Sequence, residues 1–355
     1  MIKNDYKVIG VMSGTSLDGI DMAYITFTHD ENWNYQIEQS KTYSYDEKWA
    51  KILQNLVKFS SSDLKAIDNK YTLYLSDSIK RFIDEKNIIE IDAICSHGHT
   101  ALHRPEKGLT YQIGNQEILA KRLKKVVVCD FRLQDVKMGG QGAPLVPIGD
   151  EMLFSEYDFC LNLGGFGNIS SKRNDQRIAY DICPVNIVLN HYVKILGLDY
   201  DDKGNIASTG AINELLFKRL NDLNYYKESF PKSLGLEWVR EEIFPLIDRF
   251  NLDTKDVLRT FIEHIAFQIS KETQSSNKLS MLITGGGVYN LFLINRIKNL
   301  TENNIVIPSN DIIEYKEALV FAFLGVLKIR NEINCLKSVT GAKNDHSSGT
   351  VFFPD

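Results

Sequence analysis

The chain has 355 residues, more than a single hydrophobic core usually organises, so its length predicts two domains. Hydrophobic residues make up 43% and charged residues 25% of the sequence, a usage that excludes a disordered or fibrous protein. The net charge of −5 and the lack of a dense lysine and arginine block argue against a nucleic-acid partner.

The N-terminus and the cysteines both point to the cytoplasm. The first expected strand begins near Tyr6 without the charged start and long apolar core of a secretory signal, and no run of about 18 apolar residues could cross a bilayer. The five cysteines are widely spaced and include no Cys-x-x-Cys pair, so neither a disulfide framework nor a thiolate zinc site is expected. We therefore expect a cytoplasmic protein without a membrane partner.

The first half of the chain predicts a lobe that begins with three strands. Two β-prone apolar segments flank a glycine-containing turn, and a third such segment follows. Apolar residues at spacings of three and four then indicate one face of a long helix. The expected elements are strands 6–12, 20–27 and 33–43, a helix over 64–82, strand 91–96, helix 115–124 and strand 126–129.

The second half repeats this order without repeating the sequence. Its expected elements are strands 157–163, 167–171 and 177–182, helices 184–196, 209–223 and 253–273, strand 279–284, helix 289–299, strand 304–307 and helix 315–330. Each half thus has the order strand, strand, strand, helix, strand, helix, strand. This repeated order indicates an α/β protein of two ribonuclease-H-like lobes around a central cleft. Such a cleft is the natural place for a ligand. We expect lobes over 1–135 and 136–355, divided near the glycine-rich segment 138–142, with the C-terminal segment packing back on the first lobe.

Three glycine turns are candidates for binding phosphate, because glycine lets backbone N–H groups come close to an anion. They lie in segments 10–19, 162–168 and 284–290. The first turn is not a P-loop, since it lacks the Gly-Lys-Ser/Thr ending and a strand follows it, and no helix follows the first two turns as a dinucleotide fingerprint requires. Each turn alone is also compatible with an ordinary hairpin.

The joint placement of the three turns favours a nucleotide. One turn joins the first two strands of each lobe, and the Gly-Gly-Gly of the third turn opens a helix whose N-terminus can meet an anion. In the first turn Ser13, Thr15 and Ser16 add hydroxyl donors, and Asp18 or Asp21 could hold Mg²⁺ through water. Two hairpins around a triphosphate and a glycine-rich helix start near adenosine resemble the hexokinase, actin and Hsp70 superfamily.

Specific motifs resemble the anhydro-N-acetylmuramic acid kinase family over most of the chain. These motifs are Val11–Asp21, Ser96–Thr100, His103–Pro105, Asp130–Arg132, Gly139–Pro147, Asn162–Ile169 and Val339–Ala342. The resemblance implies that ATP and Mg²⁺ are used, that water opens the 1,6-anhydro bond of the sugar, and that the γ-phosphate goes to O6 to give N-acetylmuramic acid 6-phosphate in peptidoglycan recycling.

The resemblance also implies a set of site residues. Asp181 would be the catalytic base that takes a proton from the attacking water. ATP would be bound by Gly14, Thr15, Ser16, Leu17, Asp18, Gly19, Ile20, Asp21, Gly164, Gly165, Asn168, Gly285, Gly286, Gly287 and Asn290, and the sugar by His97, Arg104, Asp130, Arg132 and Glu317. No direct metal ligand from the protein is expected, and a homodimer is left open.

Two motifs depart from the family pattern. Where the family usually has Asp-Thr-Gly-Pro-x-Asn, this chain has Ile182 and Cys183 in place of the threonine and glycine, and His99 stands where the family has glutamine. The aspartate, proline and asparagine of the first motif are kept. The departures bear on sugar specificity.

Each singled-out residue also has an ordinary structural interpretation. Asp181 before a helix could be an N-cap, and Glu317 near a helix start could merely complement the helix dipole. Asp130 and Arg132 could form an internal ion pair. His97, His99 and His103 could share a zinc ion, although no second cluster of ligands is evident and hydrogen bonding is the favoured use.

Three functions remain as alternatives to the family reaction. The same fold could phosphorylate another amino sugar, it could bind a nucleotide without chemistry, or the histidine cluster could serve a metal hydrolase. Consumption of ATP that depends on the anhydro sugar would separate the family kinase from a nucleotide-binding protein without chemistry, and stoichiometric zinc would indicate the metal hydrolase.

Overall fold

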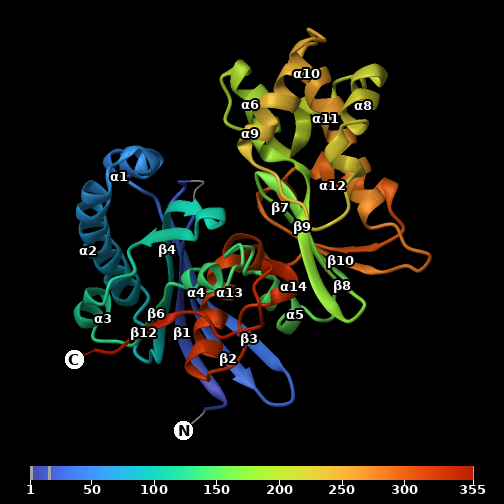
Figure 1. Ribbon diagram of the computed structural model, residues 1–355. Helices are drawn as coiled ribbons and strands as arrows, with labels where there is room; N and C mark the ends of the chain where they lie inside the picture. Colours follow the sequence, from blue (N-terminus) through green and yellow to red (C-terminus); the bar gives the residue numbers. More distant parts are fainter. Residues whose placement is uncertain (1–2, 15–16, 355) are drawn as a thin grey trace. The chain divides into compact units, whose positions relative to one another are not determined.

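The computed structural model describes residues 3–14 and 17–354. The chain folds into two compact units (Figure 1), one made of Met1–Phe154 with Tyr315–Asp355 and the other of Ser155–Glu314. The boundary predicted between residues 135 and 136 therefore differs from the observed division. The segment 138–142 is a turn inside the first unit, where the Gly142 N–H donates to Asp135 at 2.7 Å and the Gln141 N–H to the Thr340 carbonyl at 2.8 Å.

The first unit is built on a seven-stranded sheet with the order β12-β6-β4-β1-β2-β3, to which β5 adds by pairing with β4. The strands β1, β2 and β3 are antiparallel, whereas β4 and β6 run parallel to β1. The strands are β1 (Asp5–Ser13), β2 (Ile20–His29), β3 (Trp33–Tyr43), β4 (Ala93–Arg104), β5 (Leu109–Ile113), β6 (Val127–Cys129) and β12 (Thr350–Phe352). The helices are α1 (Glu47–Gln54), α2 (Ser61–Glu85), α3 (Ile118–Leu123), α4 (Leu133–Lys137), α5 (Pro147–Met152), α13 (Asn310–Ile329) and α14 (Lys337–Thr340), of which α13 begins in the second unit.

The second unit is built on a five-stranded sheet with the order β11-β10-β7-β8-β9. Here too the first three strands are antiparallel and the last two run parallel to the first. The strands are β7 (Phe159–Leu163), β8 (Phe166–Arg173), β9 (Gln176–Pro184), β10 (Ser280–Thr284) and β11 (Asn304–Val306). The helices are α6 (Asn186–Val193), α7 (Asn205–Ser208), α8 (Glu214–Asn221), α9 (Leu236–Trp238), α10 (Phe244–Asp248), α11 (Thr254–Glu272) and α12 (Leu291–Leu300).

The two sheets share one connectivity, which confirms the predicted pair of ribonuclease-H-like lobes. In both sheets, the first strand is followed by two antiparallel strands on one side of it. The chain then adds two strands on the other side of the first strand. The glycine turns at residues 14–19 and 164–165 accordingly join equivalent pairs of strands.

Helices cover both faces of the first sheet. The apolar face of α2, with Tyr71 and Phe82, packs on the side of β1 that carries Ile9 and Val11. Residues alternate between the faces of a strand, so Gly10 lies on the other side, against α13. In the second unit, α6, α8, α11 and α12 form a core with alternate residues of β7, β8 and β9.

Several element boundaries differ from the expected ones. The strand predicted over 91–96 continues as β4 to Arg104, because it pairs with β5, which was not predicted. The strand β12 and the helices α1, α4, α5, α7, α9 and α10 were also missed, and the helix expected over 209–223 is the shorter α8. These segments are short, so their hydrophobic periodicity is weak.

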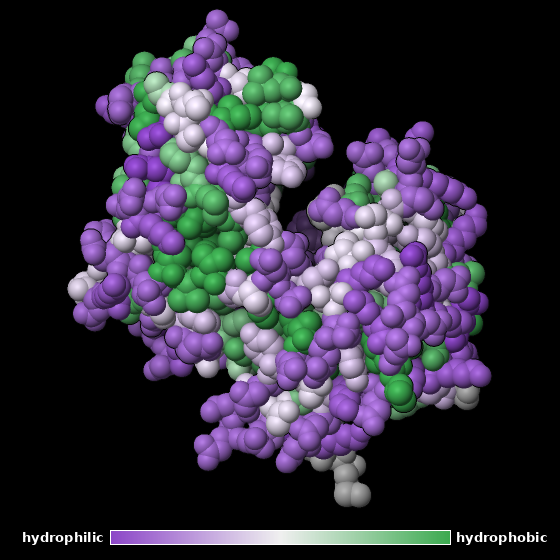
Figure 2. All heavy atoms as spheres, turned by 180° about the vertical axis from the view of Figure 1, so that it is seen from behind, coloured by the Kyte–Doolittle hydropathy of each residue, from purple (hydrophilic) through white to green (hydrophobic). Residues whose placement is uncertain are grey.

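Within residues 3–14 and 17–354, no helix is both long and apolar enough to cross a bilayer. The face of the molecule in Figure 2 is mostly hydrophilic and carries separate hydrophobic areas. The exposed large hydrophobic side chains include Ile89, Ile195 and Tyr200.

We predict that Gly10→Ala destabilises the first unit. A β-carbon at Gly10 would lie 2.0 Å from the Ala318 carbonyl oxygen of α13, so strand and helix would have to move apart. Overpacking of this kind costs about 1–3 kcal/mol, and scanning calorimetry should therefore show a lower melting temperature. An unchanged melting temperature would contradict the close approach of β1 and α13.

Candidate functional site

The first glycine turn closes the β1–β2 hairpin, in which Ser13 pairs with Ile20. The Leu17 N–H donates to the Gly14 carbonyl at 3.4 Å, while the predicted ATP ligands Thr15 and Ser16 lie outside the described residues. The Ile20 side chain is fully buried in the core, so Ile20 can offer only its backbone to a nucleotide.

The two acidic residues considered for Mg²⁺ lie on this hairpin. Asp18 is exposed, and Asp21 is half-buried and accepts the Thr42 hydroxyl at 2.6 Å. Gly19 between them is buried, and a β-carbon there would meet the Tyr43 carbonyl at 2.5 Å. The hairpin therefore presents carboxylate oxygens beside a turn that is tightly packed at its second glycine.

A buried hydrogen-bond network supports the end of β1. The Ser13 hydroxyl bonds the His99 Nδ1 at 2.8 Å and the Tyr45 hydroxyl at 2.5 Å, and it accepts the Tyr71 hydroxyl at 2.9 Å. Burial lowers the pKa of His99 to about 4, so its ring is neutral at physiological pH. His99 thus supports the strand that leads into the turn, although it replaces the glutamine usual in the family.

The second glycine turn is tied to the start of α6. The Gly165 carbonyl accepts the Val185 N–H at 2.8 Å and the Ile187 N–H at 3.2 Å. The Gly164 carbonyl accepts the Asn186 N–H at 3.3 Å. Among the described residues the Gly165 N–H has no partner, and Gly165 is exposed, so this amide is available to an anion.

The third glycine turn packs directly on the second. Gly285 has a φ of +83°, and a β-carbon there would lie 2.5 Å from Asn162 Oδ1 and 2.9 Å from the Leu163 backbone. A β-carbon at Gly287 would lie 2.6 Å from the Leu163 side chain, whereas one at Gly286 would meet nothing within 4 Å. Gly285 and Gly287 therefore allow the close approach, and Gly286 faces open space.

The expectation that Gly-Gly-Gly itself opens a helix is wrong. A short 3₁₀ turn over Gly286–Tyr289 intervenes, and α12 begins at Leu291. Asn290 is the N-cap of α12, since its side chain accepts the Leu293 N–H at 2.9 Å. The turn is glycine-rich because its backbone lies on β7, not because it forms a helix N-terminus.

A row of polar side chains crosses the sheet of the second unit. Thr284 of β10 pairs with Asn162 of β7, which pairs with Asn168 of β8, which pairs with Asp181 of β9. Residues paired across strands lie on the same face, opposite the helix-side core that holds Tyr180 and Ile182. The predicted residues Asn168 and Asp181 are thereby brought together, and Asn162 is a further member that was not singled out.

Asp181 is a partly buried carboxylate and not an N-cap. It lies within β9, and α6 starts at Asn186 after Val185, which makes no side-chain cap. Its Oδ2 accepts the Leu234 N–H at 2.8 Å, and its carbonyl accepts the Tyr225 hydroxyl at 2.6 Å. Burial raises the pKa of Asp181, partly opposed by the bond from Leu234. The carboxylate is thus held in place and is more basic than an exposed aspartate.

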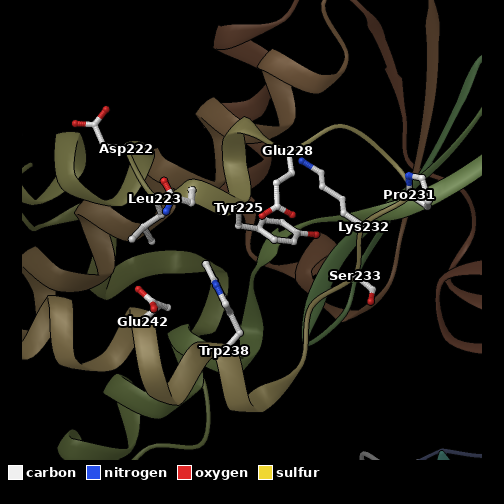
Figure 3. A pocket seen from close by; sticks show the side chains of 10 residues that line it. Asp222, Leu223, Tyr225, Glu228, Pro231, Lys232, Ser233, Trp238 and Glu242 are labelled. Atoms are coloured by element: carbon white, nitrogen blue, oxygen red, sulfur yellow. The ribbon is translucent and has the colours of Figure 1, made fainter. Parts of the chain in front are cut away.

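A cavity of about 470 Å³ lies beside this segment in the second unit (Figure 3). In that view the Tyr225 ring lies between Glu228 and Trp238, and the Trp238 ring centre is 5.4 Å from that of Tyr225. Lys232 lines the cavity and pairs with Glu272 at 3.4 Å. The cavity shares Tyr225 with the surroundings of Asp181 but not the carboxylate itself.

In the first unit, Arg132 is the centre of a polar network. Its Nε donates to His97 Nε2 at 2.8 Å and its Nη1 to the Gly142 carbonyl at 2.7 Å. The His97 Nδ1 lies 2.9 Å from the Gly98 carbonyl and carries the ring proton, since Nε2 accepts from Arg132. Burial and Arg132 lower the pKa of His97 well below its usual value, so both ring nitrogens of a neutral imidazole are engaged. His97 supports Arg132, and a direct bond to sugar would have to break this network.

Asp130 does not form the ion pair with Arg132 that was considered. It adopts a left-handed backbone with φ of +57°, and its Oδ1 accepts Asn115 Nδ2 at 3.1 Å. Asn115 Nδ2 also donates to the His97 carbonyl at 3.1 Å, while Asn115 Oδ1 is buried and has no partner. Burial raises the pKa of Asp130 to about 6. A strained, partly buried carboxyl beside an unpartnered amide oxygen is typical of a ligand site.

The remaining two predicted sugar ligands come from different elements of the first unit, α13 and β4. Glu317 is exposed. Burial lowers the pKa of Arg132, and the charge of Glu317 partly opposes this shift. Because α13 begins at Asn310, Glu317 is not in the first turn and the helix-dipole interpretation is wrong. Arg104 is exposed at the end of β4, and its neighbour His103 lies close to Gly142, where a β-carbon would be 3.4 Å from His103 Cε1.

The histidine cluster does not form a metal site in the described part of the chain. His97 bonds Arg132, His99 bonds Ser13, and His103 Nδ1 lies 3.1 Å from the Thr110 hydroxyl. The three rings have separate partners, and the grouping that could hold a metal ion includes none of them. The zinc hydrolase hypothesis is therefore wrong for this cluster.

Two ribonuclease-H-like units, each with a glycine turn between its first two strands, define a protein of the actin-like ATPase class. A family model described as anhydro-N-acetylmuramic acid kinase matches residues 6–354. The chain belongs to this family.

Individual relatives agree with the family match. The anhydro-N-acetylmuramic acid kinase of Sulfurimonas denitrificans is 31% identical over 97% of this chain and 98% of its own length. That of Haemophilus influenzae is 32% identical, with 98% of both chains covered. Component A of the (R)-2-hydroxyglutaryl-CoA dehydratase of Acidaminococcus fermentans aligns over 92% of this chain and 99% of that chain with 10% identity and a TM-score of 0.49, too low to support an argument about function.

We predict that Gly285→Ala and Gly286→Ala have different effects on stability. At Gly285 the backbone is left-handed and the added carbon would collide with the backbone of Leu163, whereas at Gly286 it meets open space. Thermal unfolding should show a lower melting temperature for Gly285→Ala and a nearly unchanged one for Gly286→Ala, which is the matched control. Equal melting temperatures for the two variants would contradict the packing of the third turn on β7.

We predict that Asp130→Asn changes the pH dependence of stability. The pKa of Asp130 in the folded protein, about 6, lies above its ordinary value of 3.8, so the native state loses stability as pH rises through this interval. Relative to the parent, the variant should gain up to about 3 kcal/mol between about pH 4 and about pH 7. Calorimetry across this range measures the gain.

Asp175→Asn is the control for this series, because the Asp175 side chain is 99% exposed. Its stability difference from the parent should stay flat over the same pH range. A flat difference for Asp130→Asn as well would show that Asp130 ionises as an exposed carboxyl does.

Proposed function

We propose that this chain opens 1,6-anhydro-N-acetylmuramic acid with water and transfers the γ-phosphate of ATP to O6, giving N-acetylmuramic acid 6-phosphate for peptidoglycan recycling. The observation that carries the proposal is Asp181, a partly buried carboxylate with raised pKa in the polar row beside two glycine turns. The family match over residues 6–354 supports the substrate. The reaction belongs in the cytoplasm, where ATP is present.

The chemistry follows from the position of one base. Asp181 takes a proton from water as the water oxygen bonds to the anomeric carbon C1, and the bond between C1 and O6 breaks. The electron pair of that bond stays on O6, which then attacks the γ-phosphorus while the bond to the ADP oxygen breaks. Asp181 later releases its proton to solvent. Carboxyl burial supports this role, since a raised pKa makes the carboxylate a better proton acceptor.

The glycine turns would bind the phosphates of ATP. The Gly165 N–H and the open surface at Gly286 offer backbone groups without side chains in the way, and we propose that the first turn contributes in the same manner. The exposed carboxylate of Asp18 and the half-buried one of Asp21 fit a hydrated cation, and we propose that they contact Mg²⁺ through water. Bound Mg²⁺ would neutralise charge on the transferring phosphoryl group.

The sugar would be bound by residues of the first unit. Arg132, fixed by His97 and Gly142, offers its remaining N–H groups to an anionic or polar part of the sugar, and Asp130 with Asn115 offers acceptors to hydroxyls. Glu317 is exposed and near enough to Arg132 to affect its pKa, which supports a place in the same sugar site. Arg104, at the far end of β4, would contact a more distant part of the substrate.

We predict that Asp181→Asn lowers turnover by at least about 10²-fold, the usual scale for loss of a general base, while the protein still folds and binds ATP. Asparagine nearly preserves the shape but cannot take the proton. Sugar opening and phosphate transfer should fall together, because O6 becomes a nucleophile only when its bond to C1 breaks. Turnover is measured by mass spectrometry of the phosphorylated sugar.

The control is Asp175→Asn, an exposed carboxylate on the β8–β9 hairpin that should leave turnover unchanged. With the parent enzyme, reaction in water labelled with ¹⁸O should place label at C1 and none in phosphate. Near-normal turnover of Asp181→Asn, or label only in inorganic phosphate, would refute the role of Asp181. Faster phosphorylation of a different amino sugar would keep the mechanism of transfer but overturn the proposed substrate.

A further inference from the structure

Three potential metal ligands meet in the first unit, away from the histidines considered from the sequence. Asp135 of α4, Cys335 and His346 each offer one ligand atom, and these atoms all lie within 4.8 Å of one another. All three residues are buried, with exposed fractions of 0% for Asp135, 2% for Cys335 and 8% for His346. An isolated antiparallel bridge between Cys335 and His346 holds two of the ligands side by side.

His346 carries the observation that points to a ligand. Its Nδ1 lies 3.0 Å from the Asn344 carbonyl, which can only accept, so Nδ1 holds the proton of the neutral ring. The other nitrogen, Nε2, is buried without a hydrogen-bond partner in the described structure and lies 3.6 Å from Asp135 Oδ1. A buried nitrogen left without a partner costs about 1–3 kcal/mol, so its lone pair requires an explanation.

Hydrogen bonds orient the Asp135 carboxylate in the way that is usual for a metal ligand. Asp135 Oδ2 accepts the Gly142 N–H and Oδ1 accepts the Thr340 hydroxyl, both at 2.7 Å. Ligand carboxylates and histidines in metal sites are generally oriented by such second hydrogen bonds, the histidine through its other nitrogen. A set of one thiolate, one imidazole and one carboxylate suits Zn²⁺ better than Mg²⁺ or Ca²⁺, which prefer oxygen ligands alone.

We propose that Asp135, Cys335 and His346 bind one zinc ion, with water in the fourth position of a tetrahedral site. On binding, the S–H bond of Cys335 breaks, a bond from sulfur to zinc forms, and the proton goes to solvent. The zinc ion would fasten the segment 335–346 to α4 and, through Asp135 and Gly142, would stabilise the position of Arg132.

The test uses the full chain, reduced, stripped of metal with a chelator and titrated with Co²⁺ or with ZnCl₂. One equivalent of Co²⁺ should produce the visible bands of tetrahedral cobalt together with a near-ultraviolet band from thiolate to cobalt, and Zn²⁺ should displace it. One equivalent of Zn²⁺ should also raise the melting temperature. These readouts do not involve kinase activity, so the proposal can fail while the proposed function stands.

Cys335→Ser and His346→Gln should each weaken zinc binding by more than about tenfold, and Cys335→Ser should remove the thiolate band. Cys129→Ala is the matched control, since it removes another buried thiol of the same unit and should leave cobalt binding intact. Absence of stoichiometric binding by the parent chain would overturn the proposal in favour of a metal-free contact between His346 and Asp135. Binding that survives both ligand substitutions would overturn it equally.

Discussion

The register of the strands determines where the reactive groups of this protein lie. In the second unit, Asn162, Asn168 and Asp181 share one face only because β7, β8 and β9 pair in that register. A slip by one residue would exchange Asp181 with Tyr180 or Ile182, which are buried in the helix-side core. The strong apolar preference of the core face therefore fixes the polar row on the other face.

Strand pairing also fixes the position of the end of β1. Ser13 pairs with Ile20 of β2 and with His99 of β4, so the glycine turn starts at a point that is held from both sides. The hydroxyl and imidazole partners of Ser13 hold the strand end in place without a charge, since burial keeps the His99 ring neutral. A turn that begins at a firmly held strand end can present its backbone amides to a charged ligand with little rearrangement.

The fold could be predicted from the sequence largely because both lobes have strong periodicity. Long elements such as α2 and α11 follow from apolar spacing, and the β1–β2 and β7–β8 hairpins follow from turns between apolar segments. The division of the chain could not be predicted, because the glycines at 139–142 signal a turn in the same way whether or not a domain ends there. It is decided by long-range contacts, such as the ion pair of Asp150 with Lys316 at 2.7 Å, which sequence spacing does not reveal.

The site could be predicted only where one motif carries it. Asp181 lies on β9 and Gly164 and Gly165 form the β7–β8 turn of the same unit, and contacts with Leu163 bring Gly285 and Gly287 beside that turn. The hydrogen bonds that individual side chains make could not be predicted from the sequence. Asn290 caps α12, which depends on where that helix begins. His97 accepts a hydrogen bond from Arg132, a partner distant in sequence.

The two departures in the motif around Asp181 are explained by burial. Ile182 is 1% exposed and Cys183 is fully buried, and both belong to the helix-side core of the second unit. Ile182 lies at a bulge of β9, because Asp181 and Cys183 pair with the consecutive residues Asn168 and Gly167 of β8, and its side chain packs in that core. These two positions therefore contribute packing volume, and in the proposed function recognition of the sugar would fall to polar groups such as Asp181 and, in the first unit, Arg132. A change of substrate within this family is accordingly expected to follow changes at those groups, and the substitutions at 182 and 183 alone give no reason to assign a different sugar.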